Sequence, residues 1–259
     1  MTVAWGLLFV LFAGLYAWRR AERRALRRSW QSLVGAGAAS GAAFDPASVG
    51  GLPAPAQRLF RFAIEPGAPL HTVVEVDMHG ELGLGTKNAP NYRPMRARQV
   101  LAPPAGFIWA VDTGSGLARI TGSDGMTATT SWSHFALFGL LPVVRAGGTE
   151  DHRRAAFGRL VGEAVFWAPA ALLPGTGVHW VAVDADTARV TVEFAGLTQS
   201  ADVTVASDGR PVSVVLPRWS DANPEKTFRL QPFGGTLAGF ETFDGYRLPT
   251  QIEAGNFFG

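Results

Sequence analysis

Val74-Glu75-Val76-Asp77-Met78-His79 alternates apolar and polar side chains, and this stretch decides the fold class. Alternation with a period of two is typical of a β-strand with one buried face, because successive side chains point to opposite sides of the strand. Strand-forming segments of this kind continue along most of the chain after residue 71. The further candidates are residues 107–111, 117–121, 126–133, 178–183, 188–194, 201–206, 211–216, 227–231 and 246–253.

Asp-Gly pairs separate several of these candidate strands. Asp124-Gly125, Asp208-Gly209 and Asp244-Gly245 each lie between β-prone segments. The pair tolerates the positive φ angles of a type I′ turn, so each one predicts a hairpin. Consecutive hairpins favour antiparallel meanders over β-α-β units.

Two helices are expected within the β-rich region. Pro53 and Pro55 suit the start of a short helix, since the first turn needs no backbone donor. Apolar residues at helical spacing predict a longer helix over residues 151–168, which Pro169 stops. The sequence therefore predicts an α+β fold, mainly antiparallel β, in which a curved sheet or incomplete barrel carries helices on one face.

Residues 1–18 form an apolar segment before this domain. Residues 2–18 contain no charged side chain and, at about 1.5 Å per residue, would span roughly 26 Å as a helix, near the lower limit for crossing a bilayer. Trp5, Tyr16 and Trp18 lie near its ends, as headgroup-facing aromatic residues do. No basic residue precedes the segment, so we expect a retained transmembrane helix rather than a cleaved signal peptide.

An arginine-rich segment, residues 19–34, follows directly. By the positive-inside rule it predicts a single-pass protein of the cell membrane with its body in the cytoplasm. The arginines either bind anionic membrane lipid or act as a topology signal alone. They form two adjacent columns at i, i+4 spacing and are Arg19, Arg20, Arg23, Arg24, Arg27 and Arg28. A Gly/Ala-rich linker, residues 35–44, then leads to a single β-rich domain, residues 45–259.

The distribution of charge excludes nucleic acid as a partner. Six of the 23 basic residues but one of the 21 acidic residues lie between Arg19 and Arg28, which leaves 17 basic and 20 acidic residues elsewhere. A nucleic-acid interface needs basic residues spread over a docking face. The chain has no cysteine, which excludes disulfides and thiolate metal sites.

Three segments resemble one protein family. They are residues 52–62, 103–109 and 163–174, and the most specific is Glu163-Ala164-Val165-Phe166-Trp167 with Pro169 after it. These segments resemble a bacterial membrane-associated family, the domain of unknown function 6544, over roughly residues 52–259. The resemblance implies one continuous domain and a link to the membrane. It implies no activity and no catalytic residue.

Asp112 is the catalytic candidate with the most specific sequence motif. Val111-Asp112-Thr113-Gly114-Ser115 resembles the motif of aspartic proteases, whose chemistry needs two carboxylates that share a proton. A second such motif is absent from the sequence, so a homodimer would have to supply the second aspartate. The simpler interpretation is a hairpin turn, for which Asp-Thr-Gly-Ser is ordinary composition. The five histidines lack metal-ligand spacing, so we expect no metal and no cofactor.

Other side chains suit a ligand. Glu163 and Trp167 lie one turn apart on the predicted helix, and Arg96 and Arg98 share a strand face that could hold a carboxylate or phosphate. The simpler alternative for Glu163 is a surface position paired with Arg159. The simpler alternative for Arg96 and Arg98 is a solvated strand face.

Residues 135–144 form an almost unbroken apolar run that is too short to cross a bilayer. We expect it in the core. The alternative is a hydrophobic lip at a lipid-accepting cavity or at the membrane surface.

These observations predict a membrane-anchored, non-enzymatic module that binds a lipophilic ligand in a cavity between sheet and helix. Membrane lipid and a lipophilic small molecule are the expected partners, and the sequence identifies no protein partner. The alternatives are a structural or partner-binding membrane protein without a ligand, and a dimeric protease-like hydrolase that uses Asp112. The candidate ligand-binding residues are Trp132, Phe138, Glu163, Trp167, Arg96 and Arg98.

Overall fold

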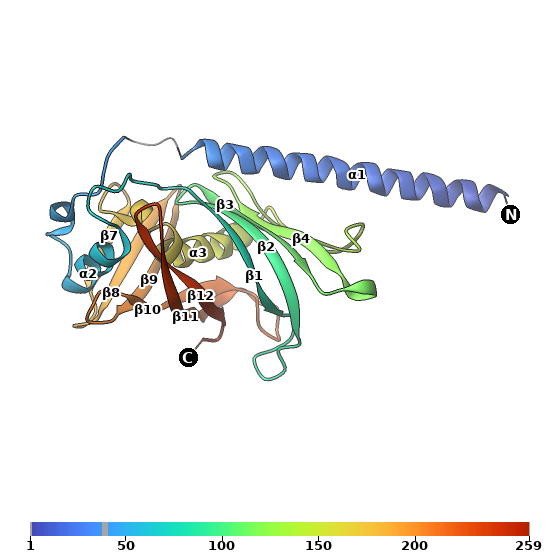
Figure 1. The fold of residues 1–259 in the computed structure, drawn as a ribbon. Coiled ribbons are helices and arrows are strands. Elements are labelled where there is room, and N and C mark those ends of the chain that lie inside the picture. The colour runs from blue at the N-terminus through green and yellow to red at the C-terminus, as the bar shows by residue number, and fades with distance from the viewer. Residues whose placement is uncertain (1, 38–40, 259) are drawn as a thin grey trace.

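Two six-stranded antiparallel sheets make up most of the computed structural model, which describes residues 2–37 and 41–258 (Figure 1). Both sheets are meanders, because strands that follow one another in the chain also pair in space. Sheet 1 contains β1 (Val74–Gly83), β2 (Tyr92–Ala102), β3 (Gly106–Thr113), β4 (Ile120–Met126), β5 (Ser131–Leu137) and β6 (Leu141–Gly147). Sheet 2 contains β7 (Val178–Ala182), β8 (Thr187–Phe194), β9 (Leu197–Val205), β10 (Pro211–Ser220), β11 (Arg229–Phe243) and β12 (Tyr246–Asn256).

The predicted α+β class with mainly antiparallel strands is confirmed, but the layering differs from a single curved sheet. Helix α3 (Glu150–Trp167) connects the sheets and lies between them, against β9 and β10 of sheet 2 and against strands of sheet 1 (Figure 1). Within the described residues, neither sheet closes into a barrel. The shorter helices are α2 (Ala54–Ala63), η1 (Pro46–Val49), η2 (Gly116–Ala118) and η3 (Pro169–Leu172).

Small residues allow sheet 2 to approach α3 closely. A Cβ atom at Gly158 would lie 2.9 Å from Oε1 of Gln199, and one at Gly162 would lie 3.0 Å from a methyl carbon of Leu216. The two glycines are one turn apart, so they open one face of the helix. The helix is buried along most of its length as a result.

The turn predictions have mixed outcomes. Asp208-Gly209 and Asp244-Gly245 do join neighbouring antiparallel strands, and Asp244 and Gly245 have φ angles of 48° and 83°. The hairpin predicted at Asp124-Gly125 is wrong, because both residues lie inside β4. Asp124 is needed there as the partner of a buried arginine on α3. The predicted strands 117–121 and 126–133 are therefore out of position, since the turn falls between β4 and β5.

Helix α1 (Thr2–Gly35) continues without a break from the predicted membrane segment into the arginine-rich segment. Its C-terminal half packs on the outer face of sheet 1, where Leu33 is buried with Val100 and Ile108. Its N-terminal half extends past the sheets (Figure 1). In this half the exposed apolar side chains include Trp5, Phe9, Val10, Leu11, Phe12 and Tyr16.

No helix within residues 2–37 and 41–258 combines the length and the mean hydropathy of a membrane span. The transmembrane helix therefore stays a prediction. Of the predicted linker, residues 38–40 lie outside the described residues. Phe44, at its other end, is buried in the main core.

Half of the apolar run of residues 135–144 is exposed, so the expectation of core burial is wrong for it. Ala136 is buried, whereas Phe138, Leu141, Val143 and Val144 are exposed. The physical reason is topological: the run forms the β5–β6 turn and part of β6, which is the edge strand of sheet 1.

Candidate functional site

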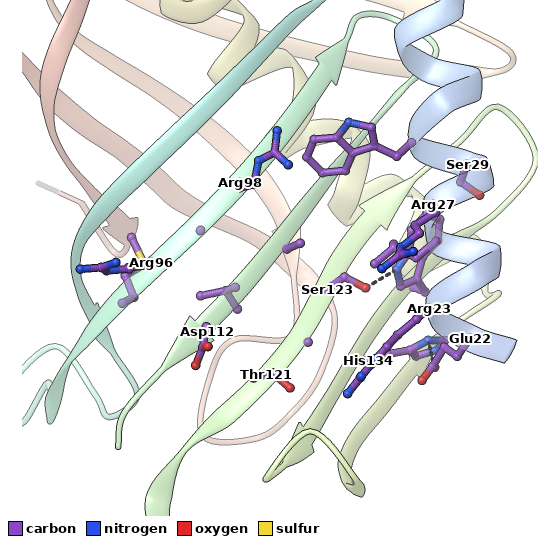
Figure 2. A pocket seen from close by; sticks show the side chains of 18 of the residues that line it. Glu22, Arg23, Arg27, Ser29, Arg96, Arg98, Asp112, Thr121, Ser123 and His134 are labelled. Atoms are coloured by element: carbon purple, nitrogen blue, oxygen red, sulfur yellow. Dashed lines mark hydrogen bonds and ion pairs between the residues drawn. The ribbon is translucent and has the colours of Figure 1, made fainter. Parts of the chain in front are cut away.

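A groove of about 1780 Å³ lies between the C-terminal half of α1 and the outer face of sheet 1 (Figure 2). Figure 2 shows Arg23 and Arg27 reaching from the helix over the strands that carry Ser123 and His134. The apolar contact between α1 and the sheet is near Leu33, which meets Val100 and Ile108, whereas nearer the N-terminus polar side chains of α1 reach the sheet across the groove.

The alternation of each strand makes the floor of the groove polar. Residues such as Ala97 and Val111 point to the core, so their sequence neighbours point outward under α1. The pairing of the strands then aligns these neighbours, with Arg96 opposite His79 and Arg98 opposite Asp77. The floor side chains are Asp77, His79, Glu81, Arg96, Arg98, Ala110, Asp112, Thr121, Ser123, Trp132, His134 and Arg145.

Glu22 fastens α1 to the strands at one end of the groove. Its Oε1 atom accepts hydrogen bonds from Nη1 of Arg145 at 2.6 Å and from Nδ1 of His134 at 2.9 Å. Its other carboxylate oxygen pairs with Arg19 on the same helix. Burial would raise the pKa of Glu22, but the hydrogen bond from Arg145 and the neighbouring positive charges outweigh burial and lower that pKa.

His134 is favoured in its neutral form. Burial and the charge of Arg145 lower the pKa of His134, and the attraction of Glu22 offsets only part of this effect. The neutral ring donates from Nδ1 to Glu22, so this contact does not require a charged histidine.

Trp30 closes the other end of the groove. Its indole Nε1 donates to Oε1 of Glu75 at 2.7 Å. The guanidinium carbon of Arg98 lies 5.6 Å from the Trp30 ring centroid, and Nε of Arg98 donates to Asp77 at 2.8 Å. Arg98 is therefore already neutralised by the sheet.

Three other arginines of the groove have no carboxylate partner within the described residues. Nη2 of Arg23 donates only to the backbone oxygen of Gly139, at 3.1 Å. Arg27 and Arg96 make no hydrogen bond or ion pair with the described part of the chain, and all three side chains are exposed in the groove. Six arginines and four carboxylates, Glu81 among them, line the groove, so its lining carries an excess of positive charge.

A second polar cluster lies on the opposite face of sheet 1, against α3. Arg159 donates from Nη1 to Asp124 at 2.9 Å and from Nε to Glu163 at 2.7 Å. Gln99 also donates to Glu163. Two carboxylates thus bond one guanidinium, which lies over the rings of Phe107 and Trp109. Arg218 is the second cation of this cluster, and burial together with the charge of Arg159 lowers its pKa.

His152 extends this cluster between two serines. Its Nδ1 lies 2.9 Å from Oγ of Ser131 and its Nε2 lies 3.1 Å from Oγ of Ser133, which also donates to Asp124 at 2.7 Å. Burial lowers the pKa of His152 more than the charge of Asp124 raises it. Ser131 is buried, so the chain of hydrogen bonds holds the first turn of α3 against β5.

The structure separates the six predicted ligand residues. Trp132, Arg96 and Arg98 line the groove. Glu163 belongs to the buried cluster with Arg159, and Trp167 packs against Phe166 at the end of α3, with ring centroids 4.9 Å apart. Phe138 is exposed in the β5–β6 turn.

The two arginine columns of α1 also separate. Arg19, Arg23 and Arg27 line the groove, whereas Arg20, Arg24 and Arg28 are exposed outside it. Sequence reasoning identified both columns but could not say which one faces the sheet.

Asp112 lies at the end of β3, and the hairpin interpretation of its motif is confirmed. Gly114 and Gly116 have φ angles of 74° and 52° in the loop to β4. Arg119 donates to both oxygens of Asp112, at 2.9 and 2.5 Å. This hydrogen bonding lowers the pKa of Asp112.

Glu22, Trp30, His134 and Arg145 complete the groove without having been predicted as site residues. The one available signal was Glu22, the single acidic residue among the arginines of residues 19–28. The others depend on strand register and on the path of α1, which local sequence does not encode.

A family model matches residues 42–258 and is described as a family of unknown function (DUF6544). The chain belongs to this family. The match confirms the resemblance and covers the floor of the groove, while α1 lies outside the matched residues. No curated protein and no solved structure matches the chain.

Proposed function

We propose that the protein is a membrane-tethered, non-enzymatic module that binds an anionic amphiphile in the groove between α1 and sheet 1. One observation carries this proposal: Arg23 and Arg27 from α1 and Arg96 from β2 line the groove without a carboxylate partner among the described residues. A guanidinium group presents a planar set of donors that matches a carboxylate or phosphate.

The remaining surface of the groove suits the apolar part of such a ligand. Leu26, Trp30 and Trp132 line it beside the arginines, and Ala110 leaves space between them. Its volume of about 1780 Å³ is above the roughly 300–1,000 Å³ of common small-molecule pockets, so the groove has room for an amphiphile with a long acyl chain.

The N-terminal half of α1 supports the tether. It has no charged residue from Thr2 to Trp18, and its exposed apolar side chains extend beyond the sheets. A helix that is apolar on all sides needs an apolar environment, either in a core or in a bilayer. Anionic lipid would also attract the arginines that follow.

The same arginines favour a body on the cytoplasmic side of the membrane. A reporter fused after Gly259 would test this orientation. Activity of a reporter that functions only in the cytoplasm is expected, whereas activity of one that functions only outside would contradict it.

Lipid analysis of the full chain tests the ligand. The chain would be purified in a neutral detergent from a membrane with anionic and zwitterionic lipids, then extracted and measured by mass spectrometry. We expect about one anionic lipid per chain, as one headgroup site implies. The double variant Arg23→Gln/Arg27→Gln should lose it, and Arg24→Gln/Arg28→Gln should retain it.

The second variant is a matched control, because it removes the same charge from the same helix outside the groove. Equal lipid retention by both variants would show binding along the membrane surface and not in the groove. A chain that retains no lipid would instead favour a structural or partner-binding role.

A further inference from the structure

We propose that the end of sheet 1 formed by the β3–β4 loop and the β5–β6 turn is a second membrane-contact surface, which docks on an anionic bilayer beside α1. This inference rests on the proposed membrane insertion of α1 and adds a surface that the tether alone does not require. The surface is defined by Leu117, Phe138, Leu141 and Val143.

These side chains are apolar and exposed. Leu117 is 86% exposed and Phe138 47%, and Val143 on the edge strand β6 is 52% exposed. Phe138 also has a φ angle of 54°, a region that glycine and asparagine occupy more readily than phenylalanine. A large ring is thus held outward at a turn where a small polar residue would be easier to accommodate.

Hydrogen bonds fix this surface to a defined point on α1. The backbone oxygen of Gly139 accepts from Nε of Arg19 at 3.2 Å and from Nη2 of Arg23 at 3.1 Å. The two loops are joined in turn, because the backbone N–H of Phe138 donates to the oxygen of Arg119 at 2.9 Å. The surface therefore lies beside residues 19–23 of the helix.

That point is where the apolar half of α1 ends. Trp18 is the last residue before the first arginine, and the guanidinium carbon of Arg145 on β6 lies 4.5 Å from its ring centroid. If residues 2–18 lie in the bilayer, Arg19 lies at the headgroups, and the loops bonded to it lie there too. Figure 1 shows the loops at the end of sheet 1 that faces the free half of α1.

The charges next to this surface favour lipid as its partner. Arg20 and Arg24 are exposed on α1 and follow in sequence the two arginines that bond Gly139, whereas Arg119 in the β3–β4 loop is already paired with Asp112. Apolar side chains rimmed by arginine suit the boundary between acyl chains and anionic headgroups. A second copy of this chain docked on the same surface would bring its arginines close to those of the first copy, and the like charges would repel.

The cysteine-free chain allows a direct test. Single cysteines would be introduced by Phe138→Cys, Leu117→Cys and Val181→Cys in the full chain, and each would carry an environment-sensitive fluorophore. Val181 is the control, since it is 55% exposed on β7, the edge strand of sheet 2. The proteins would be reconstituted in phosphatidylcholine and phosphatidylglycerol vesicles with spin-labelled lipid.

We expect blue-shifted fluorescence and quenching by spin-labelled lipid at positions 138 and 117, and neither effect at 181. Flotation with the vesicles reports insertion of α1 separately. Chains that float while all three labels remain unquenched would overturn the contact surface and leave the tether intact. Labels at 138 and 117 shielded from aqueous iodide but not quenched by lipid would also overturn it, in favour of a protein contact.

Discussion

At the scale of single residues, Glu22 makes the polar contacts that hold α1 against sheet 1. Its carboxylate accepts from Arg145 and His134 and pairs with Arg19, so one negative charge compensates two arginines that α1 and β6 bring together. The charge is partly buried, which makes the contact stronger than a solvent-exposed ion pair. No other acidic residue lies between Arg19 and Arg28 to replace it.

Glu22→Gln should loosen the helix. The amide removes the negative charge and leaves Arg19 and Arg145 facing one another, so the helix–sheet contact should weaken by about 1–3 kcal/mol. Hydrogen exchange of the backbone amides in residues 19–34 measures this contact. Glu253→Gln, an exposed change on β12, is the control, and equal exchange in the two variants would show that Glu22 does not hold the helix.

Acid should detach the same end of α1. The pKa of His134 is lowered in the folded state, so its stabilising neutral form is lost as the pH falls below the ordinary value of 6.5. The pKa of Glu22 is also lowered, so its contribution is complete above its ordinary value of 4.5 and is lost as the pH falls further. The protection factors of the amides in residues 19–34, which correct for the pH dependence of the intrinsic exchange rate, should therefore fall in two steps on acidification.

His134→Gln should remove the first of these steps and leave the second. A single step near the ordinary value of the carboxyl group in the wild-type chain would contradict the role given to His134.

At the scale of elements, α3 is the central support of the fold. It is packed between the two sheets. Arg159 on α3 forms one ion pair with Asp124 on β4 and a second with Glu163, one turn further along α3. The sequence predicted this helix almost to its ends, because its apolar spacing and Pro169 are local signals. Its position between two sheets was not predictable, since apolar spacing does not say what covers each face.

Arg159→Met tests the buried cluster. The change keeps an unbranched apolar stem but removes the guanidinium, so Asp124 and Glu163 lose their shared partner, which should cost about 3–5 kcal/mol of folding free energy. Chemical denaturation of the full chain in detergent measures the loss. Arg154→Met, on the same helix, removes an exposed guanidinium that lies 4.1 Å from the Trp219 ring centroid, and it should cost about 0.5–1 kcal/mol.

A loss of folding free energy in the Arg159 variant no larger than in the Arg154 variant would show that other groups compensate the carboxylates.

The same cluster explains why the hairpin at Asp124-Gly125 was mispredicted. Local composition favours a turn at this pair, but the ion pair with Arg159 holds Asp124 inside β4. Asp244-Gly245 has no ion-pair partner among the residues that the structure describes, and it forms the turn that its composition predicts.

At the scale of the whole molecule, local patterns predicted the class of fold and not its assembly. Period-two alternation and Asp-Gly pairs identified most strands, and the apolar and arginine-rich segments identified α1. The groove depends on contacts between residues far apart in sequence, such as Glu22 with Arg145, for which no local signal exists. Trp132, Arg96 and Arg98 were predicted because residue type alone suits a ligand, whereas Glu163 satisfied the same criterion and lies in the interior.

The most direct test of the proposed function is to locate a bound anionic amphiphile. Crystals of the full chain grown with phosphatidylglycerol brominated along one acyl chain would show the bromine atoms by anomalous scattering. We expect them in the groove between α1 and sheet 1, near Trp132, with the phosphate within hydrogen-bonding distance of Arg23, Arg27 or Arg96. Bromine found only around residues 2–18 of α1, with an empty groove, would contradict the proposal.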